Sequence, residues 1–205
     1  MEFELDHLFI CTTIGAPEAD RLVAFGLTEG TPNVHPGQGT ANRRFFFHNF
    51  MLELLWVYNS EEAQSALIHP THLWQRWVGR SLGACPFGFC LRSTARPSSQ
   101  LPFSTWEYRP PYLPESLSYS VGMNIDVLTE PMLFYISFGQ RQDTYPADKS
   151  QPLKHAAGLY EVTRVELVSP HANIPSPELQ AMVNANLIEL RLGSEYLVLL
   201  GAGYS

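Results

Sequence analysis

The first segment of the chain alternates between apolar and acidic positions. In residues 3–12 (FELDHLFICT), one face of an extended strand carries Phe3, Leu5, His7, Phe9 and Cys11, and the other face carries Glu2, Glu4 and Asp6. This pattern predicts a strand with one buried face. His7 lies on that apolar face, so it is the first candidate for a functional residue.

A second predicted strand, FMLELLWV, holds one acidic residue among apolar ones. Met51, Glu53, Leu55 and Val57 share a face of this strand, so the Glu53 carboxylate is expected to point into packed interior. A buried carboxylate is costly unless it meets a cation, a metal ion or a hydrogen-bond donor. Glu53 therefore joins His7 as a candidate site residue.

The first module, residues 1–58, is predicted to be a βαβββ unit. A short helix (PEADRLVAFGL) follows the first strand, with Pro17 in its first turn and Gly26 at its end. The turn-rich EGTPNVHPGQG then leads into a hairpin of RRFFFH and FMLELLWV, broken at His48 and Asn49.

Residues 59–158 are expected to form a linker, middle strands and a Pro-rich insertion. Positions 61–80 are predicted to be partly helical, and FGFCLRS and PMLFYISF are predicted strands. The segment RPSSQLPFSTWEYRPPYLPES is typical of a long loop with one strand at TWEYR. Its length makes it a candidate pocket wall.

Residues 159–205 repeat the order strand, helix, strand, strand. Ser176 is the expected cap of the helix SPELQAMVNA, and Pro177 lies in its first turn. Laying this βαββ segment over the first module puts Arg164 opposite His7 and Leu197 opposite Glu53. The sequence therefore predicts an α+β fold with internal duplication in one domain, residues 1–205.

Composition excludes several classes of function. The 205 residues are 45% apolar with a net charge of −7, and no basic run is long enough to follow a phosphate backbone, so no nucleic-acid partner is expected. No apolar stretch approaches the roughly 20 residues that cross a bilayer. Neither a leader peptide nor paired cysteines are indicated, and Cys11, Cys85 and Cys90 are expected to be buried reduced thiols of a cytoplasmic protein.

The chain resembles the vicinal oxygen chelate superfamily, in particular its glyoxalase-like domain branch (glyoxalase, bleomycin resistance and dioxygenase-like proteins). The matching segments are LDHLFI, HPGQGTANRRFFF, MLELLWV, FGFCLRS, EPMLFYISF and HAAGLYEVTRVEL, which cover most of the chain. HPGQGTAN, placed between helix and hairpin, is the most specific of them. The resemblance implies paired βαβββ modules that form a curled mixed sheet with a central cleft.

The resemblance also implies a divalent metal, with His7 and Glu53 at the positions of its ligands. Imidazole and carboxylate suit zinc, nickel, manganese or iron(II) and leave coordination positions open for a substrate with two neighbouring oxygens. A glyoxalase I-type site takes a further His and Glu from the second module, where this chain has Arg164 and Leu197. His155 is a candidate third ligand, and Glu53 a candidate catalytic base.

Four further residues are candidates for binding a ligand. His35 and Asn42 flank or lie in the HPGQGTAN loop, whose glycines permit turns with positive φ. Arg44 and Arg109 are candidates to anchor an anionic substrate, because guanidinium pairs with carboxylate in bidentate fashion. No GxxxxGK[ST] pattern is present, so no nucleotide cofactor is expected.

The expected function is metal-assisted lyase or isomerase chemistry on a small oxygen-bearing metabolite. Two alternatives stay open: an iron(II) extradiol-type dioxygenase, and a non-catalytic protein that sequesters a small ligand. A purely structural His7–Glu53 hydrogen bond is a further interpretation of the same two residues. Since both modules lie in one chain, a monomer as well as a homodimer fits the sequence.

Overall fold

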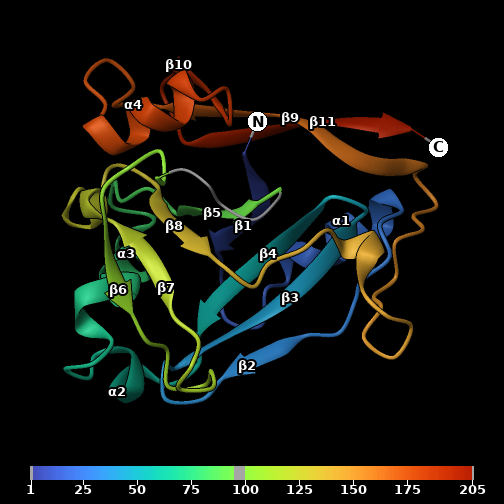
Figure 1. Cartoon of the computed structure of the whole chain (residues 1–205), viewed down its shortest axis with the longest axis horizontal. Helices are drawn as coiled ribbons and strands as arrows, with labels where there is room; N and C mark the ends of the chain where they lie inside the picture. The colour runs from blue at the N-terminus through green and yellow to red at the C-terminus, as the bar shows by residue number, and fades with distance from the viewer. Residues whose placement is uncertain (1, 95–99, 205) are drawn as a thin grey trace.

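The protein has an α+β fold built on one large mixed sheet. The computed structural model describes residues 2–94 and 100–204, so positions 96–99 of the Pro-rich segment lie outside the described residues. The large sheet has eight strands in the order β2-β3-β4-β1-β5-β8-β7-β6 (Figure 1). Its strands are β1 (Phe3–Cys11), β2 (Asn33–His35), β3 (Thr40–Phe47), β4 (Phe50–Val57), β5 (Phe87–Ser93), β6 (Thr105–Tyr108), β7 (Tyr119–Gly122) and β8 (Met132–Ile136).

The two halves of the large sheet have the same connectivity. In the first half β1 pairs with β4 in parallel, and β4, β3 and β2 follow in antiparallel pairs. In the second half β5 pairs with β8 in parallel, and β8, β7 and β6 follow in antiparallel pairs. The halves join where β1 pairs with β5 in antiparallel fashion. The large sheet is therefore made of two halves with the same strand pairing, one of them the expected first module.

The second module is residues 87–136 and not 159–205. The strands β6 and β7 have four residues each, too few to show a clear alternating pattern; β6 matches the strand expected at TWEYR, whereas β7, just after the Pro-rich segment, was not predicted. Among the described residues between β5 and β6 there is no helix. The second module therefore lacks the strand–helix–strand pattern that made the C-terminal segment look like the repeat.

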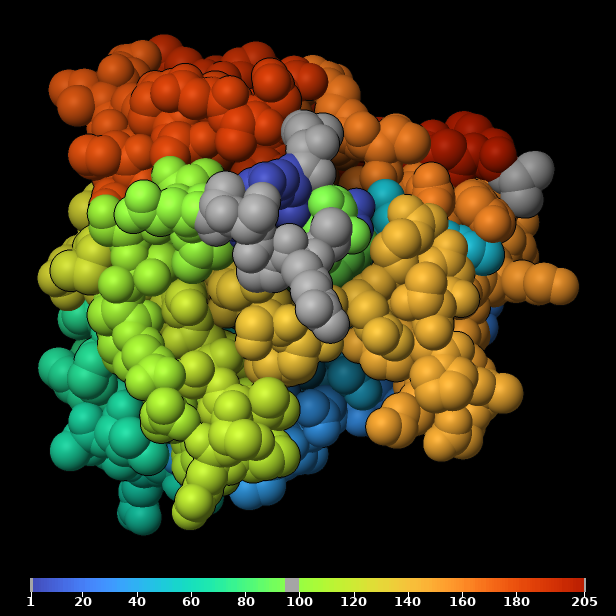
Figure 2. All heavy atoms as spheres, in the orientation of Figure 1, coloured from blue at the N-terminus to red at the C-terminus, as the bar shows by residue number. Residues whose placement is uncertain are grey.

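The C-terminal segment forms a separate unit of β9 (Leu159–Ser169), α4 (Pro177–Asn184), β10 (Glu189–Leu192) and β11 (Leu197–Tyr204). Its strand, helix, strand, strand order is the expected one, but the strands form their own three-stranded sheet, β10-β9-β11. Figure 2 shows the unit, in orange to red, packed along the upper side of the molecule. Its apolar residues join those of the large sheet in one core, which includes Leu8, Leu52, Phe89, Leu133, Val165, Leu167, Leu179 and Met182.

The helices are short and lie outside the large sheet. The helix α1 (Glu18–Phe25) ends at Gly26, whose φ of 106° and backbone N–H bonds to Leu22 and Val23 confirm the expected stop. The Ser176 side chain accepts the Leu179 N–H, which confirms the expected cap of α4. The other helices are α2 (Ser60–Ala63), α3 (Leu73–Gly79) and the 3₁₀ turns η1 (His69–Thr71), η2 (Met123–Asp126) and η3 (Gln142–Thr144). No helix among the described residues could span a bilayer.

The strict alternation expected for β1 is interrupted at Asp6. The register of β1 against β5 shifts between Leu5, which pairs with Leu91, and His7, which pairs with Cys90. An extra residue in one strand reverses the alternation from that point on. Phe3 therefore packs in the core under the C-terminal unit, whereas His7 and Phe9 face the opposite side. The placement of Asp6 on the solvent side was wrong, because only 4% of its surface is exposed.

Candidate functional site

A cleft of about 510 Å³ lies on the face of the large sheet that carries His7. Both halves of the sheet line it, with β1, β3 and β4 on one side and β6, β7 and β8 on the other. In Figure 2 the segment near 110–120 (yellow-green) and the segment near 145–152 (light orange) flank a hollow with atoms of the first module (blue) below. This volume is in the range of small-molecule sites.

Glu53 lies in the cleft wall with one carboxylate oxygen bonded and the other open. The residue is 6% exposed, and the Asn42 side chain donates an N–H to its Oε1 at 2.5 Å. Asn42 is itself fixed, because its Oδ1 accepts the backbone N–H of Asn33 at 2.8 Å. The second oxygen, Oε2, lies 3.9 Å from His7 Nε2, beyond hydrogen-bonding distance.

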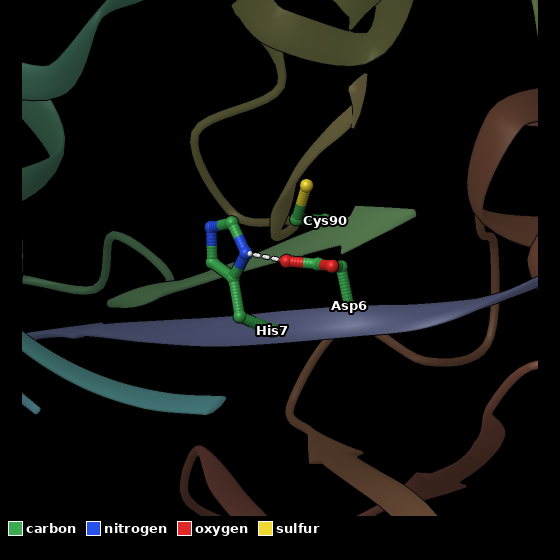
Figure 3. A group of neighbouring side chains, drawn as sticks. All are labelled: Asp6, His7 and Cys90. Carbon is green, nitrogen blue, oxygen red and sulfur yellow. Dashed lines mark hydrogen bonds and ion pairs between the residues drawn. The ribbon is translucent and has the colours of Figure 1, made fainter. Parts of the chain in front are cut away.

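His7 is oriented by its neighbour in the sequence. The Nδ1 atom of His7 lies 2.7 Å from Asp6 Oδ1 (Figure 3). Asp6 Oδ2 accepts from Arg92 Nη1 at 3.0 Å. Burial by itself would raise the pKa of Asp6, but the hydrogen bonds and charges of His7 and Arg92 outweigh it, and the pKa lies below its ordinary value. An ionised Asp6 holds a proton on His7 Nδ1, so the other nitrogen, Nε2, is left for the cleft.

Cys90 completes a buried group with Asp6 and His7. The possible ligand atoms of these three residues lie within 4.8 Å of one another, and Figure 3 shows them side by side. Two observations argue against a metal cation there. The Asp6 carboxylate already forms an ion pair with Arg92, and complete burial raises the pKa of the Cys90 thiol well above its ordinary value. The group is better explained as support for His7 than as a metal site.

The donors that face the cleft do not fit a resident metal ion. His7 Nε2 and Glu53 Oε2 are two donors, whereas catalytic sites usually have three from the protein. The strands of the second module that correspond to β1 and β4 are β5 and β8, with the sequences FGFCLRS and MLFYI, and they contain no histidine or carboxylate. Arg164 and Leu197 lie in the C-terminal sheet, away from the residues that line the cleft.

His155 lies outside the cleft, and both of its ring nitrogens are engaged. Its Nδ1 accepts the backbone N–H of Thr28 at 2.9 Å, and its Nε2 lies 3.0 Å from the carbonyl oxygen of Phe46. Neither nitrogen is free to bind a metal. The imidazole expected as a third ligand thus ties the loop after α1 to the end of β3.

Of the four candidate ligand-binding residues, three line the cleft. His35 lies 2.9 Å from Thr40 Oγ1 through Nδ1 and stacks on Tyr112 with ring centroids 4.5 Å apart; its burial lowers its pKa. Asn42 and Arg44 also line the cleft. Arg109 does not: its side chain is 56% exposed and its guanidinium pairs with Glu107 at 2.9 Å.

Three tyrosines also line the cleft. Tyr108 donates its hydroxyl hydrogen to Gln38 Oε1 at 2.9 Å, and the hydroxyls of Tyr112 and Tyr119 lie 3.0 Å apart. Tyr108 and Tyr112 come from the Pro-rich segment that was expected to be a pocket wall, which supports that expectation, and Tyr119 lies just after it in β7. Asp6 was missed because simple alternation put it on the other face.

Comparisons with known proteins assign no activity to the chain. No family model matches it, and no curated protein matches it. Among solved structures, it is similar to a hypothetical protein from Staphylococcus aureus, at 11% sequence identity and a TM-score of 0.49, over 96% of this chain and 88% of that one. The functional argument therefore rests on the geometry of the cleft.

Proposed function

We propose that this protein is an enzyme that moves protons on a small oxygen-bearing metabolite in the cleft, with lyase or isomerase chemistry of the glyoxalase-like kind. The observation that carries the proposal is the pairing of Glu53 and His7. One oxygen of the Glu53 carboxylate is held by Asn42, and the other is open beside His7 Nε2. Two titratable groups that face one cavity from adjacent strands can serve as base and acid.

Each residue of this group has a defined role in the proposal. Glu53 Oε2 takes a proton from a carbon next to a carbonyl or hydroxyl group of the substrate. His7 Nε2 donates a hydrogen bond, or its proton, to the neighbouring oxygen when the imidazole is protonated. Asp6 is a positioning residue, because it fixes His7 through Nδ1 and does not face the proton that moves.

The proposal assigns proton transfer to these side chains and not to a metal. The vicinal oxygen chelate resemblance leads to the expectation of zinc, nickel, manganese or iron(II), but among the described residues no third histidine, cysteine or carboxylate forms a ligand group with both His7 and Glu53. The iron(II) dioxygenase alternative also loses its third ligand, since both nitrogens of His155 are engaged elsewhere. Elemental analysis of untagged protein, beside His7→Ala/Glu53→Ala, tests this: near-stoichiometric metal lost in the variant would contradict the assignment.

A second candidate function, sequestering a small ligand without turnover, is favoured by one observation. Tyr112, Tyr119 and Phe134 form an aromatic wall of the cleft, and Phe134 contacts the His7 ring with centroids 5.4 Å apart. Aromatic walls of this kind bind flat apolar molecules with no need for acid–base groups. In either case the partner is a small molecule.

Three buried free cysteines support a cytoplasmic location for the protein.

Hydrogen–deuterium exchange separates the two candidates. The protein is incubated in D₂O with 2-hydroxy ketones, 2-hydroxy aldehydes and 2-oxo acids, and the loss of carbon-bound protons is followed by NMR. We expect catalysed exchange for at least one compound, and a loss of about a hundredfold or more in Glu53→Gln, which removes the base but preserves the shape of the side chain. Arg109→Gln, at a residue outside the cleft, should catalyse this exchange at the rate of the wild type. Saturable binding with no exchange would favour sequestration.

A further inference from the structure

Arg44 stands directly beside the proposed base. It is the register partner of Glu53 in the β3–β4 pair, and its side chain lines the same cleft. Directly opposed residues of neighbouring strands have Cβ atoms about 5 Å apart on the same face of the sheet. The guanidinium nevertheless turns away from Glu53: its Nε donates to the Thr31 carbonyl oxygen at 2.8 Å, and its carbon lies 5.2 Å from the centre of the Phe46 ring.

The charge of Arg44 meets the Phe46 ring but no carboxylate within the part of the chain that the structure describes. Its hydrogen bonds there involve Nε alone, so the two terminal nitrogens are without an acceptor, and no carboxylate forms an ion pair with it. Desolvation lowers its pKa, whereas the charge of Glu53 raises it. A half-buried guanidinium without a counter-ion is an unfavourable arrangement unless a ligand supplies the anion.

Arg43, the preceding residue, shows what a structural arginine looks like in this fold. It points to the opposite face of β3, where Glu29 accepts from Nε and Nη2 at 2.7 and 2.6 Å and Asp20 accepts from Nη1 at 2.8 Å. These carboxylates raise the pKa of Arg43 above its ordinary value. Of two consecutive arginines, one is thus saturated with carboxylates, and the other lines the cleft with its two terminal nitrogens free of protein acceptors among the described residues.

We infer that the substrate carries a carboxylate and that Arg44 binds it in bidentate fashion through its terminal nitrogens. This inference rests on the proposed function, because it places the reacting carbon of the same molecule beside Glu53. The planar fork of guanidinium matches the two oxygens of a carboxylate. The wall of Tyr112, Tyr119 and Phe134 then receives an apolar or aromatic body. The ligand class is therefore a small carboxylic acid with an apolar group and an oxygen at the neighbouring carbon.

The other charges of the cleft favour a single negative charge over a dianion. Asp6 and Glu53 both line it, so a phosphate monoester would meet two carboxylates with one half-buried guanidinium to offset them. Lys149, on the rim, is exposed and adds attraction at the entrance without fixing an orientation.

The test compares binding of a carboxylate with that of its uncharged amide. Mandelate and mandelamide, which differ at this group alone, are titrated against the full-length protein by calorimetry and by ligand-observed NMR. The wild type should bind mandelate at least about tenfold more tightly than mandelamide, as expected for a bidentate charged pair. Arg44→Gln should abolish that preference, and Arg44→Lys, which retains the charge but not the fork, should reduce it.

Arg109→Gln is the matched control, because it removes an equally charged residue that lies outside the cleft. It should retain the full preference for mandelate. An unchanged preference in Arg44→Gln, or equal affinities of the wild type for both probes, or binding of neither, would overturn the inference. Melting temperatures of all variants show whether a lost preference reflects a lost fold.

Glu53→Gln distinguishes failure of this inference from failure of the proposed function. The variant retains Arg44, so it should still prefer mandelate while losing proton exchange. If the wild type prefers the carboxylate through Arg44 but catalyses no proton exchange, the protein binds carboxylates and the enzyme proposal is refuted. Exchange that depends on Glu53 without carboxylate preference would retain the enzyme and refute the role of Arg44.

Discussion

Asp6 and His7, adjacent in the sequence, meet on the same side of β1, where Asp6 Oδ1 lies 2.7 Å from His7 Nδ1. In a regular strand they would point to opposite faces. The register shift at Asp6 brings them together and also places Asp6 against the buried Arg92. The orientation of the candidate catalytic histidine thus depends on a local irregularity of the sheet.

Asp6→Asn is expected to destabilise the protein by about 3 kcal/mol, because it leaves the buried Arg92 guanidinium short of a charged partner. Glu4, which also pairs with Arg92 but is 31% exposed, offers the control. Glu4→Gln should cost no more than about 1 kcal/mol. Urea unfolding measures both changes. Equal losses would show that the buried Asp6–Arg92 pair contributes no more to the free energy of unfolding than the more exposed Glu4–Arg92 pair.

Acidification is expected to destabilise the fold through His155 before the carboxylates titrate. Burial is the main cause that places the pKa of His155 below its ordinary 6.5, and its Nδ1 must be unprotonated to accept the Thr28 N–H. The stabilisation is therefore complete above the unfolded pKa and is lost as the pH falls through 6.5 toward the folded value.

The free energy of unfolding should accordingly fall between about pH 7.5 and 5.5. His155→Gln, which does not titrate, should flatten that part of the profile. His69→Gln, at an exposed histidine, should leave the slope unchanged. A slope that persists in His155→Gln would assign the effect to another group.

The contact between Asn42 and Glu53 should appear as coupling in a double-mutant cycle. Asn42→Leu leaves the buried carboxylate without its donor, and Glu53→Leu leaves the amide without its acceptor, so each should cost about 2 kcal/mol. The double variant should cost at least about 1 kcal/mol less than the sum, because no unpaired group remains. Strict additivity in denaturant unfolding would mean that the two side chains do not interact in solution.

Gly39→Ala should destabilise the protein strongly, because a Cβ there would lie 2.2 Å from the Asn59 carbonyl oxygen and the φ of Gly39 is +76°. Gly83 has a φ of +102°, but a Cβ at this position would meet no atom within 4 Å, so Gly83→Ala tests the backbone cost alone. We expect about 1 kcal/mol for Gly83→Ala and at least about 2 kcal/mol more for Gly39→Ala. Thermal unfolding compares the two variants. Similar losses of stability would mean that Gly39 does not lie as close to the Asn59 carbonyl oxygen as the structure places it.

The sequence by itself determined the first module and the two polar residues that matter most in it. Strands of eight or nine residues, rich in apolar and aromatic side chains, are long enough to recognise, so β1, β3 and β4 were predicted, and Glu53 stood out in an otherwise apolar strand. The glycines of HPGQG also signalled their own conformation, since Gly37 and Gly39 both have positive φ. These features depend on residues close together in the sequence, so the sequence alone is enough to predict them.

Tertiary structure alone decided which segments face each other. Pairing between strands far apart in the sequence placed residues 87–136, and not 159–205, beside the first module, and the short β6 and β7 left no periodic signal of it. The shift at Asp6 arises from pairing with β5, so the sequence of β1 does not show it. Likewise, Arg44 and Arg109 look equivalent as residues, and only the curl of the sheet puts one in the cleft and the other in solvent.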